Sequence, residues 1–272
     1  MFSVLMSVYA AEDPLNLEAA LSSVWDSQSL KPSEIVLVKD GPLGIPLNGV
    51  IQQWMDKLRT NLKVVSLEHN VGLANALNVG LEHCSFELVA RMDSDDISYP
   101  DRFKLQVEFM NCNPGIVASS GIIDEWDPGL NRVTGARIVP RGGRSLRKYA
   151  KFRSPLSHPA TIFRKSVIQD LGGYPRFNNA QDYALWSLLL ASGYELANLS
   201  EKLLRMRVGD GFIERRGKDF FLQELKLLRY QLNIGFLSRS QFLANIVIKV
   251  VLRLSPNRVK VLFYKYARGG TT

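Results

Sequence analysis

A dense acidic cluster is the most chemically suggestive feature of this 272-residue sequence. In "ELVARMDSDDISYPDR", residues 87–102, Asp93, Asp95 and Asp96 fall within four positions. Carboxylates this close repel one another and raise one another's pKa unless a cation compensates. In an extended segment Asp93 and Asp95 share a face while Ser94 points away. Two oxygens on one face suit Mg²⁺ or Mn²⁺, which commonly completes its shell with phosphate oxygens, so the pattern predicts a metal–diphosphate site. The alternative is that Asp95 and Asp96 cap the following helix, and Asp96 is expected to serve the following turn.

Two further carboxylates, Asp40 and Asp182, lie at positions where they could bind a ligand or accept a proton. Asp40, in "VKDG", precedes Gly41, which permits a turn and the close approach of a ligand. Such a carboxylate can accept an N–H of a nucleobase or a ribose hydroxyl, or it can simply belong to a turn. Asp182, in "NAQDYALW", falls in the first turn of an expected helix. It is either a general base facing a sugar hydroxyl or a favourable charge at the helix dipole.

Two ring-bearing side chains have both a structural and a functional interpretation. His158, one of three histidines, is either a hydrogen-bonded strand residue or a contact to the diphosphate or the acceptor near the metal. Trp186, four residues after Asp182, is more typical of a core residue than of a platform on which a sugar stacks.

The expected elements bring these side chains to one place. Short apolar runs at 2–9, 34–40, 62–68 and 86–93 are typical of strands buried on both faces. Helical patterns at 14–28, 48–60 and 71–84 separate them, which predicts right-handed crossovers and a largely parallel sheet. Ligands of such sheets bind beyond the carboxyl ends of the strands. The residues at those ends are Ser7, Tyr9, Lys39, Asp40, Glu68, Asn70, Arg91, Asp93 and Asp95.

The later part of the chain continues the alternation less regularly. The patterns predict a helix at 100–114, a strand at 115–123, a strand with a short helix at 158–174, and a helix at 180–194. Residues 124–156 are rich in Gly, Arg and Pro and are expected to leave the core, with a β-hairpin near 131–138. From about residue 220 to 267 the pattern is helical.

Composition and termini place the chain among ordinary globular proteins. A 46% hydrophobic content supports a large core. Cys84 and Cys112 follow no disulfide or metal-ligand spacing, which fits a reducing cytosol. The first residues read as a strand and not as a signal peptide. The apolar stretch 242–254 is too short and too charged to span a membrane, so no transmembrane helix is expected.

Positive charge is concentrated near the end of the chain. The formal net charge is +8, and residues 202–272 hold 15 Lys and Arg against 4 Asp and Glu. Residues 217–268 combine these charges with apolar residues at helical spacing, as in helices that lie on anionic membranes. The alternative is a helical appendage with a solvated basic face. Nucleic acid is not an expected partner, because no binding motif accompanies the charge.

Several of these segments, taken together, resemble a known family. They are "SVLMSVYAAEDPLNLEAALSSVWDSQ", "EIVLVKDG", "NVGLANALNVGLE", "VARMDSDDISYPDRFKLQ", "SHPATIFRKSVIQDLGGY" and "AQDYALWSLLLASGY". Their order is similar to that in family 2 glycosyltransferases of bacterial surface-polysaccharide (O-antigen and exopolysaccharide) biosynthesis. The resemblance covers roughly residues 2–210.

The resemblance implies an α/β GT-A fold, a Rossmann-like, mostly parallel mixed sheet flanked by helices. Residues 1–215 would form the catalytic domain, with a nucleotide-sugar half at 1–100 and an acceptor half at 101–215. Residues 216–272 would form a helical, basic, membrane-proximal appendage.

The resemblance also implies a role for each matching residue. Asp40 would contact uracil, with Ser7 and Tyr9 on the base and ribose side. Asp93 would meet ribose or the sugar phosphate, Asp95 would bind Mn²⁺ or Mg²⁺, and Asp182 would deprotonate the acceptor. Many relatives carry Asn and Arg where this chain has Ala10 and Leu77. Arg91 and Lys39 are the candidates to replace their donor contacts.

The implied reaction is an inverting transfer of a hexose, galactose or glucose, from a UDP-sugar. The acceptor would be a sugar hydroxyl on an undecaprenyl-diphosphate lipid, and the product a β-glycoside made at the cytoplasmic face by a peripheral membrane protein. A nucleotidyl- or phosphoryl-transfer enzyme is a rival, although the chain lacks a P-loop. A glycoside hydrolase would not need Asp40. The remaining alternative is a non-catalytic nucleotide-sugar-binding membrane protein.

Overall fold

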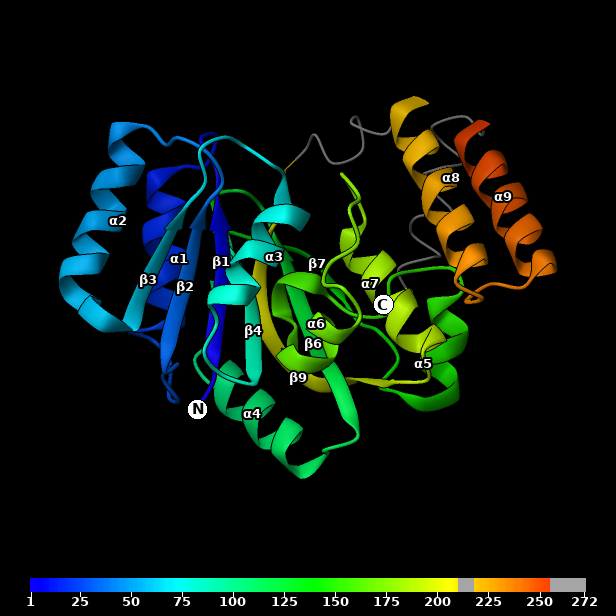
Figure 1. Cartoon of the computed structure of the whole chain (residues 1–272), viewed down its shortest axis with the longest axis horizontal. Coiled ribbons are helices and arrows are strands. Elements are labelled where there is room, and N and C mark those ends of the chain that lie inside the picture. The colour runs from blue at the N-terminus through cyan, green and yellow to red at the C-terminus, as the bar shows by residue number, and fades with distance from the viewer. Residues whose placement is uncertain (210–217, 255–272) are drawn as a thin grey trace.

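A single mixed sheet flanked by helices organises the protein (Figure 1). The computed structural model describes residues 1–209 and 218–254. Within them the sheet has nine strands in the order β3-β2-β1-β4-β8-β6-β9-β5, with β7 paired to β6. The strands are β1 Ser3–Val8, β2 Glu34–Lys39, β3 Leu62–Ser66, β4 Leu88–Asp93, β5 Ile97–Ser98, β6 Ile116–Trp126, β7 Val133–Arg137, β8 Ile162–Arg164 and β9 Glu195–Arg207.

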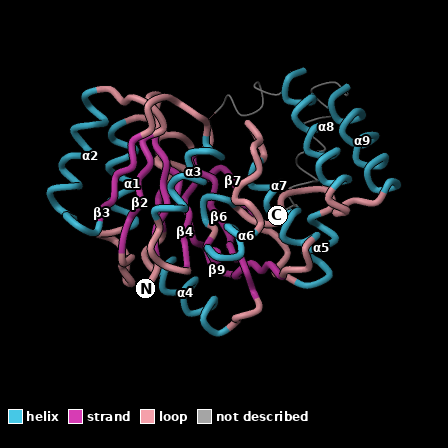
Figure 2. The backbone as a smooth tube through the Cα atoms, in the orientation of Figure 1, coloured by secondary structure: helices cyan, strands magenta, loops and turns pink. Residues whose placement is uncertain are grey.

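Helices cover both faces of this sheet, as the tube view shows (Figure 2). They are α1 Pro14–Val24, α2 Ile45–Leu58, α3 Leu73–His83, α4 Arg102–Cys112, α5 Gly143–Ala150, α6 Lys165–Asp170, α7 Gln181–Ala191, α8 Lys218–Asn233 and α9 Arg239–Leu254. Single 3-10 turns occur at Arg59–Asn61 and His158–Ala160. On β1, Val4 and Met6 pack with α1, α2 and α4, whereas Leu5 packs with α3 and α7. Alternate residues of a strand therefore enter two separate apolar layers.

The amino-terminal half has the predicted parallel arrangement. Strand β1 pairs in parallel with β2 and with β4, and β2 pairs in parallel with β3. Ser7 lies level with Asp93, and Val8 lies level with Lys39. The carboxyl ends of these strands consequently meet at one edge, where the candidate residues were expected.

The second half departs from the prediction in three places. Strand β9, with 13 residues, runs parallel to β6 but was not predicted, because its sequence mixes charged and apolar residues without a clean period. Helix α5 lies within 124–156, a segment expected to leave the core. The hairpin expected near 131–138 is present with a wider extent, because β7 is its second strand and the end of β6 is its first. His158 lies in a 3-10 turn and not in a strand.

The carboxyl-terminal helices form a hairpin beside α7. Figure 1 shows α8 and α9 side by side at the end of the molecule away from α2. The helical character expected from about residue 220 is confirmed as far as residue 254, in two helices separated by a turn where Gly235 has φ +70°. The part of that expectation beyond residue 254 lies outside the described residues. Of the helices in the described ranges, none combines the length and the apolar character needed to pass through a bilayer.

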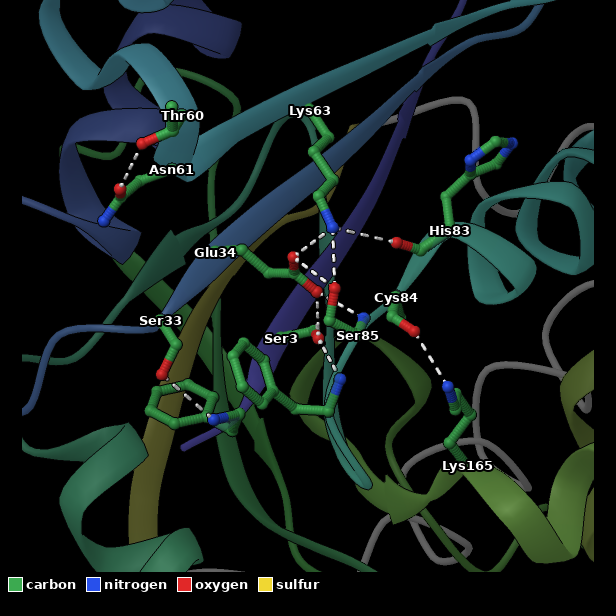
Figure 3. Close-up of polar contacts among 12 residues, drawn as sticks. Ser3, Ser33, Glu34, Thr60, Asn61, Lys63, His83, Cys84, Ser85 and Lys165 are labelled. Atoms are coloured by element: carbon green, nitrogen blue, oxygen red, sulfur yellow. Dashed lines mark hydrogen bonds and ion pairs between the residues drawn. The ribbon is translucent and has the colours of Figure 1, made fainter.

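A buried carboxylate links the strands at their amino ends, opposite the carboxyl ends where the candidate residues lie (Figure 3). Glu34 begins β2 and accepts hydrogen bonds from Ser3 Oγ at 2.7 Å and from the Ser85 amide at 2.5 Å. Lys63 Nζ on β3 lies 2.6 Å from it. Burial disfavours the charged form, but Lys63, Ser3 and Ser85 outweigh it and lower the pKa of Glu34. This carboxylate thereby joins the amino ends of three parallel strands to the loop before β4.

Replacing Glu34 by Gln is expected to cost about 2 kcal/mol of unfolding free energy at pH 7, because charge-assisted hydrogen bonds are lost. The folded-state pKa lies below the ordinary value of 4.5. The contribution is therefore complete above that value and is lost as the pH falls through the folded-state pKa. Urea unfolding at pH 7 and at pH 3.5 measures the difference between the two proteins, which should shrink at the lower pH. Asp26→Asn, which removes the exposed pair with Lys57, is the control and should change stability by less than about 1 kcal/mol.

Candidate active site

The three clustered carboxylates converge at the end of β4. Ligand oxygens of Asp93, Asp95 and Asp96 all lie within 4.8 Å of one another. Ser94 points elsewhere and donates a hydrogen bond to Glu12 Oε2 at 2.5 Å. The alternation of the chain therefore separates Ser94 from the acidic residues on either side of it.

Asp96 belongs to this cluster, and its expected role in the following turn is wrong. Its Oδ1 accepts a hydrogen bond from the backbone N–H of Arg207 on β9 at 3.0 Å, and its buried Oδ2 has no partner. The residue that precedes α4 is Asp101, so neither Asp95 nor Asp96 caps that helix. A contact from a strand more than a hundred residues later decides where Asp96 points, and the local sequence carries no signal of it.

Burial and mutual repulsion raise the pKa of two members of the cluster. Burial, Asp93 and Glu12 raise the pKa of Asp95 to about 6. Burial, Asp93 and Asp95 hold the pKa of Asp96 well above its ordinary value. The site thus carries more negative charge than its surroundings neutralise.

A buried arginine lies among these acids. Arg91 on β4 is 1% exposed and forms an ion pair with Asp93 through Nη2, while its Nε and Nη1 have no partner. Its charge lowers the pKa of Asp95, Asp96 and Asp182 relative to what burial alone would give. Arg91 is thus a positive charge that the acidic cluster and Asp182 both sense.

Arg102, which hydrogen-bonds the backbone of Arg91, was not predicted from the sequence. Arg102 opens α4, is completely buried, and donates from Nη2 to the Arg91 carbonyl at 2.6 Å and from Nε to Gln106 Oε1 at 3.0 Å. Burial, and then repulsion from Arg91, lower its pKa to about 9. A charged residue followed by apolar Phe103 at a helix start resembles an ordinary surface position, so its burial could not be predicted from the local pattern.

Asp40 serves a turn and also faces the same edge. Its carboxylate accepts the backbone N–H groups of Val71 at 2.7 Å and Gly72 at 3.2 Å. Gly41 is required beside it, because φ is +89° and a Cβ would lie 2.7 Å from the Asn70 nitrogen. The two bonds therefore give the carboxylate a fixed orientation and tie the end of β2 to the loop before α3.

Ser7 and Tyr9 occupy the neighbouring strand end. Ser7 is partly buried between β2 and β4, and Tyr9, just beyond β1, is 50% exposed. The Asp40 amide donates to the Val8 carbonyl at 2.8 Å, which continues the strand pairing to this point. The backbone therefore places Ser7 level with Asp93 and brings Tyr9 to the same end of the strands.

Asp182 lies partly buried in the first turn of α7. Ala180 precedes it with φ +66°, in the left-handed region. Ser154 Oγ donates to Asp182 Oδ2 at 3.3 Å, and Arg137 is a nearby positive charge. Burial outweighs these contacts and raises the pKa of Asp182. A carboxylate with a raised pKa is a better proton acceptor near neutral pH. Ser154 and Arg137 lie in the segment expected to leave the core and were not predicted.

His158 and Trp186 lie beneath the site. His158 is buried, and its Nε2 is 3.1 Å from the Tyr174 hydroxyl. Burial and the charge of Arg91 hold its pKa well below its ordinary value, so the imidazole is neutral. Trp186 is wholly buried with the core of α7, which confirms the core interpretation.

Sequence comparison identifies the family. The pattern of Glycosyl transferase family 2 matches residues 3–172. The chain belongs to that family. The amylovoran biosynthesis glycosyltransferase AmsE of Erwinia amylovora is 36% identical over an alignment of 275 positions that covers 99% of this chain and 100% of that protein. The Escherichia coli UDP-Gal:alpha-D-GlcNAc-diphosphoundecaprenol beta-1,3-galactosyltransferase is 36% identical over 267 residues, 97% of this chain and 95% of that one.

Solved structures confirm the GT-A fold expected for this family. The mannosyltransferase PcManGT of Pyrobaculum calidifontis, solved with GDP-Man and Mn²⁺, superposes with a TM-score of 0.64 at 18% identity, over 99% of this chain and 76% of that one. Residues 1–349 of TarS from S. aureus give a TM-score of 0.61 at 23% identity, over 90% of this chain and 70% of that one. Family membership favours glycosyl transfer over the phosphoryl-transfer alternative.

The acidic cluster fits the divalent cation that such a glycosyltransferase would use. Asp95 and Asp96 both have raised pKa values, and the Oδ2 of Asp96 is buried without a partner. A hard cation prefers carboxylate oxygens and keeps several of its own waters, so two or three carboxylates suffice. Asp93, already paired to Arg91, is the member least in need of a cation.

Asp95→Asn is expected to raise the melting temperature in EDTA at pH 7.5 by about 3 °C, roughly the effect of 1 kcal/mol, because one repelling charge is removed. The folded-state pKa of Asp95, about 6, lies above its ordinary value of 3.8, so protonation of Asp95 stabilises the wild type at low pH. The wild type loses this stabilisation as the pH rises through 6. The difference in melting temperature between the two proteins should accordingly shrink as the pH falls below 6 and vanish only below the ordinary Asp value of 3.8. Saturating Mn²⁺ should stabilise the wild type more than the variant. Scanning fluorimetry measures all three, and Asp170→Asn, at an exposed position in α6, is the control that should show neither effect.

Proposed function

We propose that this family 2 glycosyltransferase moves a hexose, galactose or glucose, from a UDP-sugar to a hydroxyl of a lipid-diphosphate-linked sugar, with inversion at the anomeric carbon. The observation that carries the proposal is the convergence of the Asp93, Asp95 and Asp96 oxygens within 4.8 Å at the end of β4. Asp182, partly buried in the first turn of α7, is the candidate for the base. The polymer would be an O-antigen or exopolysaccharide repeat unit.

The nucleotide is assigned to the edge formed by β1, β2 and β4. Two backbone N–H groups orient the Asp40 carboxylate, whose remaining lone pairs can accept the N–H of uracil. Ser7 and Tyr9 would flank the base and ribose. Asp93 would meet the ribose or the sugar phosphate, held in place by Arg91. The free Nε and Nη1 of Arg91 would donate to the phosphate oxygens.

The carboxylates would hold Mn²⁺ or Mg²⁺, with Asp95 as the principal ligand and Asp96 beside it. When bound, the ion would act as a Lewis acid toward the negative charge of the departing UDP. Asp182 would remove the proton of the acceptor hydroxyl while that oxygen bonds to the anomeric carbon. The bond from this carbon to the phosphate oxygen breaks, and its electron pair leaves with UDP. Attack from the face opposite UDP converts an α-linked donor into a β-linked product.

The relatives support the choice of donor and acceptor. The name of the Escherichia coli relative specifies UDP-Gal and a diphosphoundecaprenol-linked GlcNAc. TarS has been solved with UDP and with UDP-GlcNAc. We extend these features to this chain as proposals, with undecaprenyl diphosphate as the acceptor lipid. His158 would border the diphosphate or the acceptor, with Tyr174 fixing its ring.

The α8–α9 hairpin supports a membrane location. Its exposed apolar side chains are Leu222, Leu243, Val247 and Ile248, and its exposed basic side chains are Lys226, Arg229 and Arg239. Each basic residue near an anionic surface contributes about 1 kcal/mol to binding. We therefore propose that residues 216–272 are a membrane-proximal appendage of a catalytic domain at 1–215. The protein would be cytoplasmic and peripheral on the inner face of the plasma membrane.

Asp182→Asn is expected to lower the transfer rate by about 10²- to 10⁴-fold, because the amide cannot accept the proton. Binding of UDP with Mn²⁺ should be unchanged in calorimetry, whereas Asp95→Asn should lose the metal-dependent part of that binding. Transfer is measured as UDP release with UDP-, GDP- and TDP-sugars and a synthetic lipid-diphosphate GlcNAc acceptor. UDP binding without transfer from any donor would favour the non-catalytic alternative. A near-normal rate for Asp182→Asn would remove Asp182 from the role of base.

Liposome flotation tests the membrane location. The protein should float with vesicles that contain anionic lipid, and less so with neutral vesicles or at 0.5 M salt, because the attraction is electrostatic. Lys226→Glu combined with Arg229→Glu should weaken flotation without changing UDP binding. Equal recovery with neutral and anionic vesicles, or no flotation at any salt concentration, would contradict this location.

A further inference from the structure

Gln231 is a completely buried polar side chain where α8 meets α7. Its Nε2 donates to Ser187 Oγ at 2.8 Å. Ser187 Oγ in turn donates to the Tyr183 carbonyl at 2.7 Å. Tyr183 is the residue next to Asp182, so α8 is connected by hydrogen bonds to the turn that carries the candidate base.

Burying the amide of Gln231 is energetically unfavourable, and an apolar side chain could pack at the same place without this cost. The Oε1 of Gln231 is buried without a partner. An apolar side chain of similar size would avoid the cost of an unpaired carbonyl. Apolar contacts already hold the same interface, because Leu228 and Phe236 join the core cluster of Leu185 and Leu189. The hydrogen bond of the amide therefore fixes how α8 and α7 are oriented relative to each other, which apolar contacts alone would do less specifically.

The hairpin also reaches Asp182 from its other side. Lys151, just after α5, donates from Nζ to the Phe236 carbonyl and lies 3.8 Å from the Phe236 ring centre. Asn245 on α9 donates to the Lys151 carbonyl at 3.1 Å. Three residues later, Ser154 donates to Asp182 Oδ2. The Tyr183 hydroxyl closes the link by donating to the Ala150 carbonyl at 2.6 Å.

We propose that Gln231 is a positioning residue that acts through α7, so that the α8–α9 hairpin sets the orientation of Asp182. This inference rests on the proposed role of Asp182 as base. A base must sit within a fraction of an ångström of its productive position, and a misplacement of about 1 Å can cost roughly 10²-fold in rate. The nucleotide edge is built from β1, β2 and β4, which Gln231 does not touch. Loss of Gln231 therefore affects the rate and leaves donor binding intact.

A double-mutant cycle in the full chain tests this positioning. Gln231→Leu keeps the size and removes the amide, and Ser187→Ala removes its partner. Each is expected to lower kcat about 10-fold, with the donor KM and the UDP affinity unchanged. The double variant should be no slower than the slower single variant, because residues that act through one contact are not additive. Leu228→Val is the matched control: it loosens the same interface, keeps the amide, and should retain kcat.

Hydrogen exchange of the amides of residues 181–187 gives a readout that does not depend on transfer. These amides should exchange faster in Gln231→Leu and in Ser187→Ala than in Leu228→Val. Unchanged exchange, additive losses in kcat, a loss confined to the donor KM, or an equal loss in Leu228→Val would each overturn the inference. A wild type that releases no UDP from any donor would defeat the proposed function instead, and the exchange rates would still decide whether Gln231 orders α7.

Discussion

The repulsion among three carboxylates at the end of β4 is the constraint around which this structure is arranged. Asp93, Asp95 and Asp96 keep their oxygens within 4.8 Å of one another, and the buried charge of Arg91 pairs directly with Asp93. Such an arrangement is unfavourable by itself, and stable interactions elsewhere must offset it. Arg102 contributes by holding the Arg91 carbonyl, and β9 contributes by offering the Arg207 amide to Asp96. Both supports come from elements that lie after the cluster in the chain.

The two edges of the sheet contrast in how their polar groups are satisfied. At the amino edge, Glu34 is surrounded by donors, and its pKa is lowered. At the carboxyl edge, burial and neighbouring acids raise the pKa of Asp95 and Asp96, and an oxygen of Asp96 is left without a partner. A fully paired network stabilises a fold, whereas an incompletely paired one gains most from a charged ligand. The parallel strands place these two networks at opposite ends of the strands.

The sequence predicted the amino-terminal half well because its signals are local. Apolar runs, helical periods and the polar residues at strand ends are enough to place Ser7, Asp40 and Asp93 together. The second half depends on partners distant in the chain. Strand β9 carries Glu201 and Lys202 in its middle and has no clean alternation, so its pairing with β6 was not visible. Asp96 was assigned to a turn because its actual partner, Arg207, is far along the chain. For the same reason Arg102, Ser154 and Gln231 could not be recognised as supports of the site.

The α8–α9 hairpin contacts the catalytic domain with one face and exposes apolar side chains on the other. Toward the catalytic domain it presents Gln231 and Phe236, which reach α7 and the segment after α5. Toward solvent it exposes Leu243 and Val247, which suit the lipid surface proposed for it. If one face rests on lipid and the other orients Asp182, the same two helices determine both the height of the site above the bilayer and the direction of its base. An acceptor hydroxyl attached to a membrane lipid has a restricted height of its own. Coupling the base to the element that contacts the lipid would keep these two positions matched, which a base held only by the nucleotide-binding sheet would not achieve.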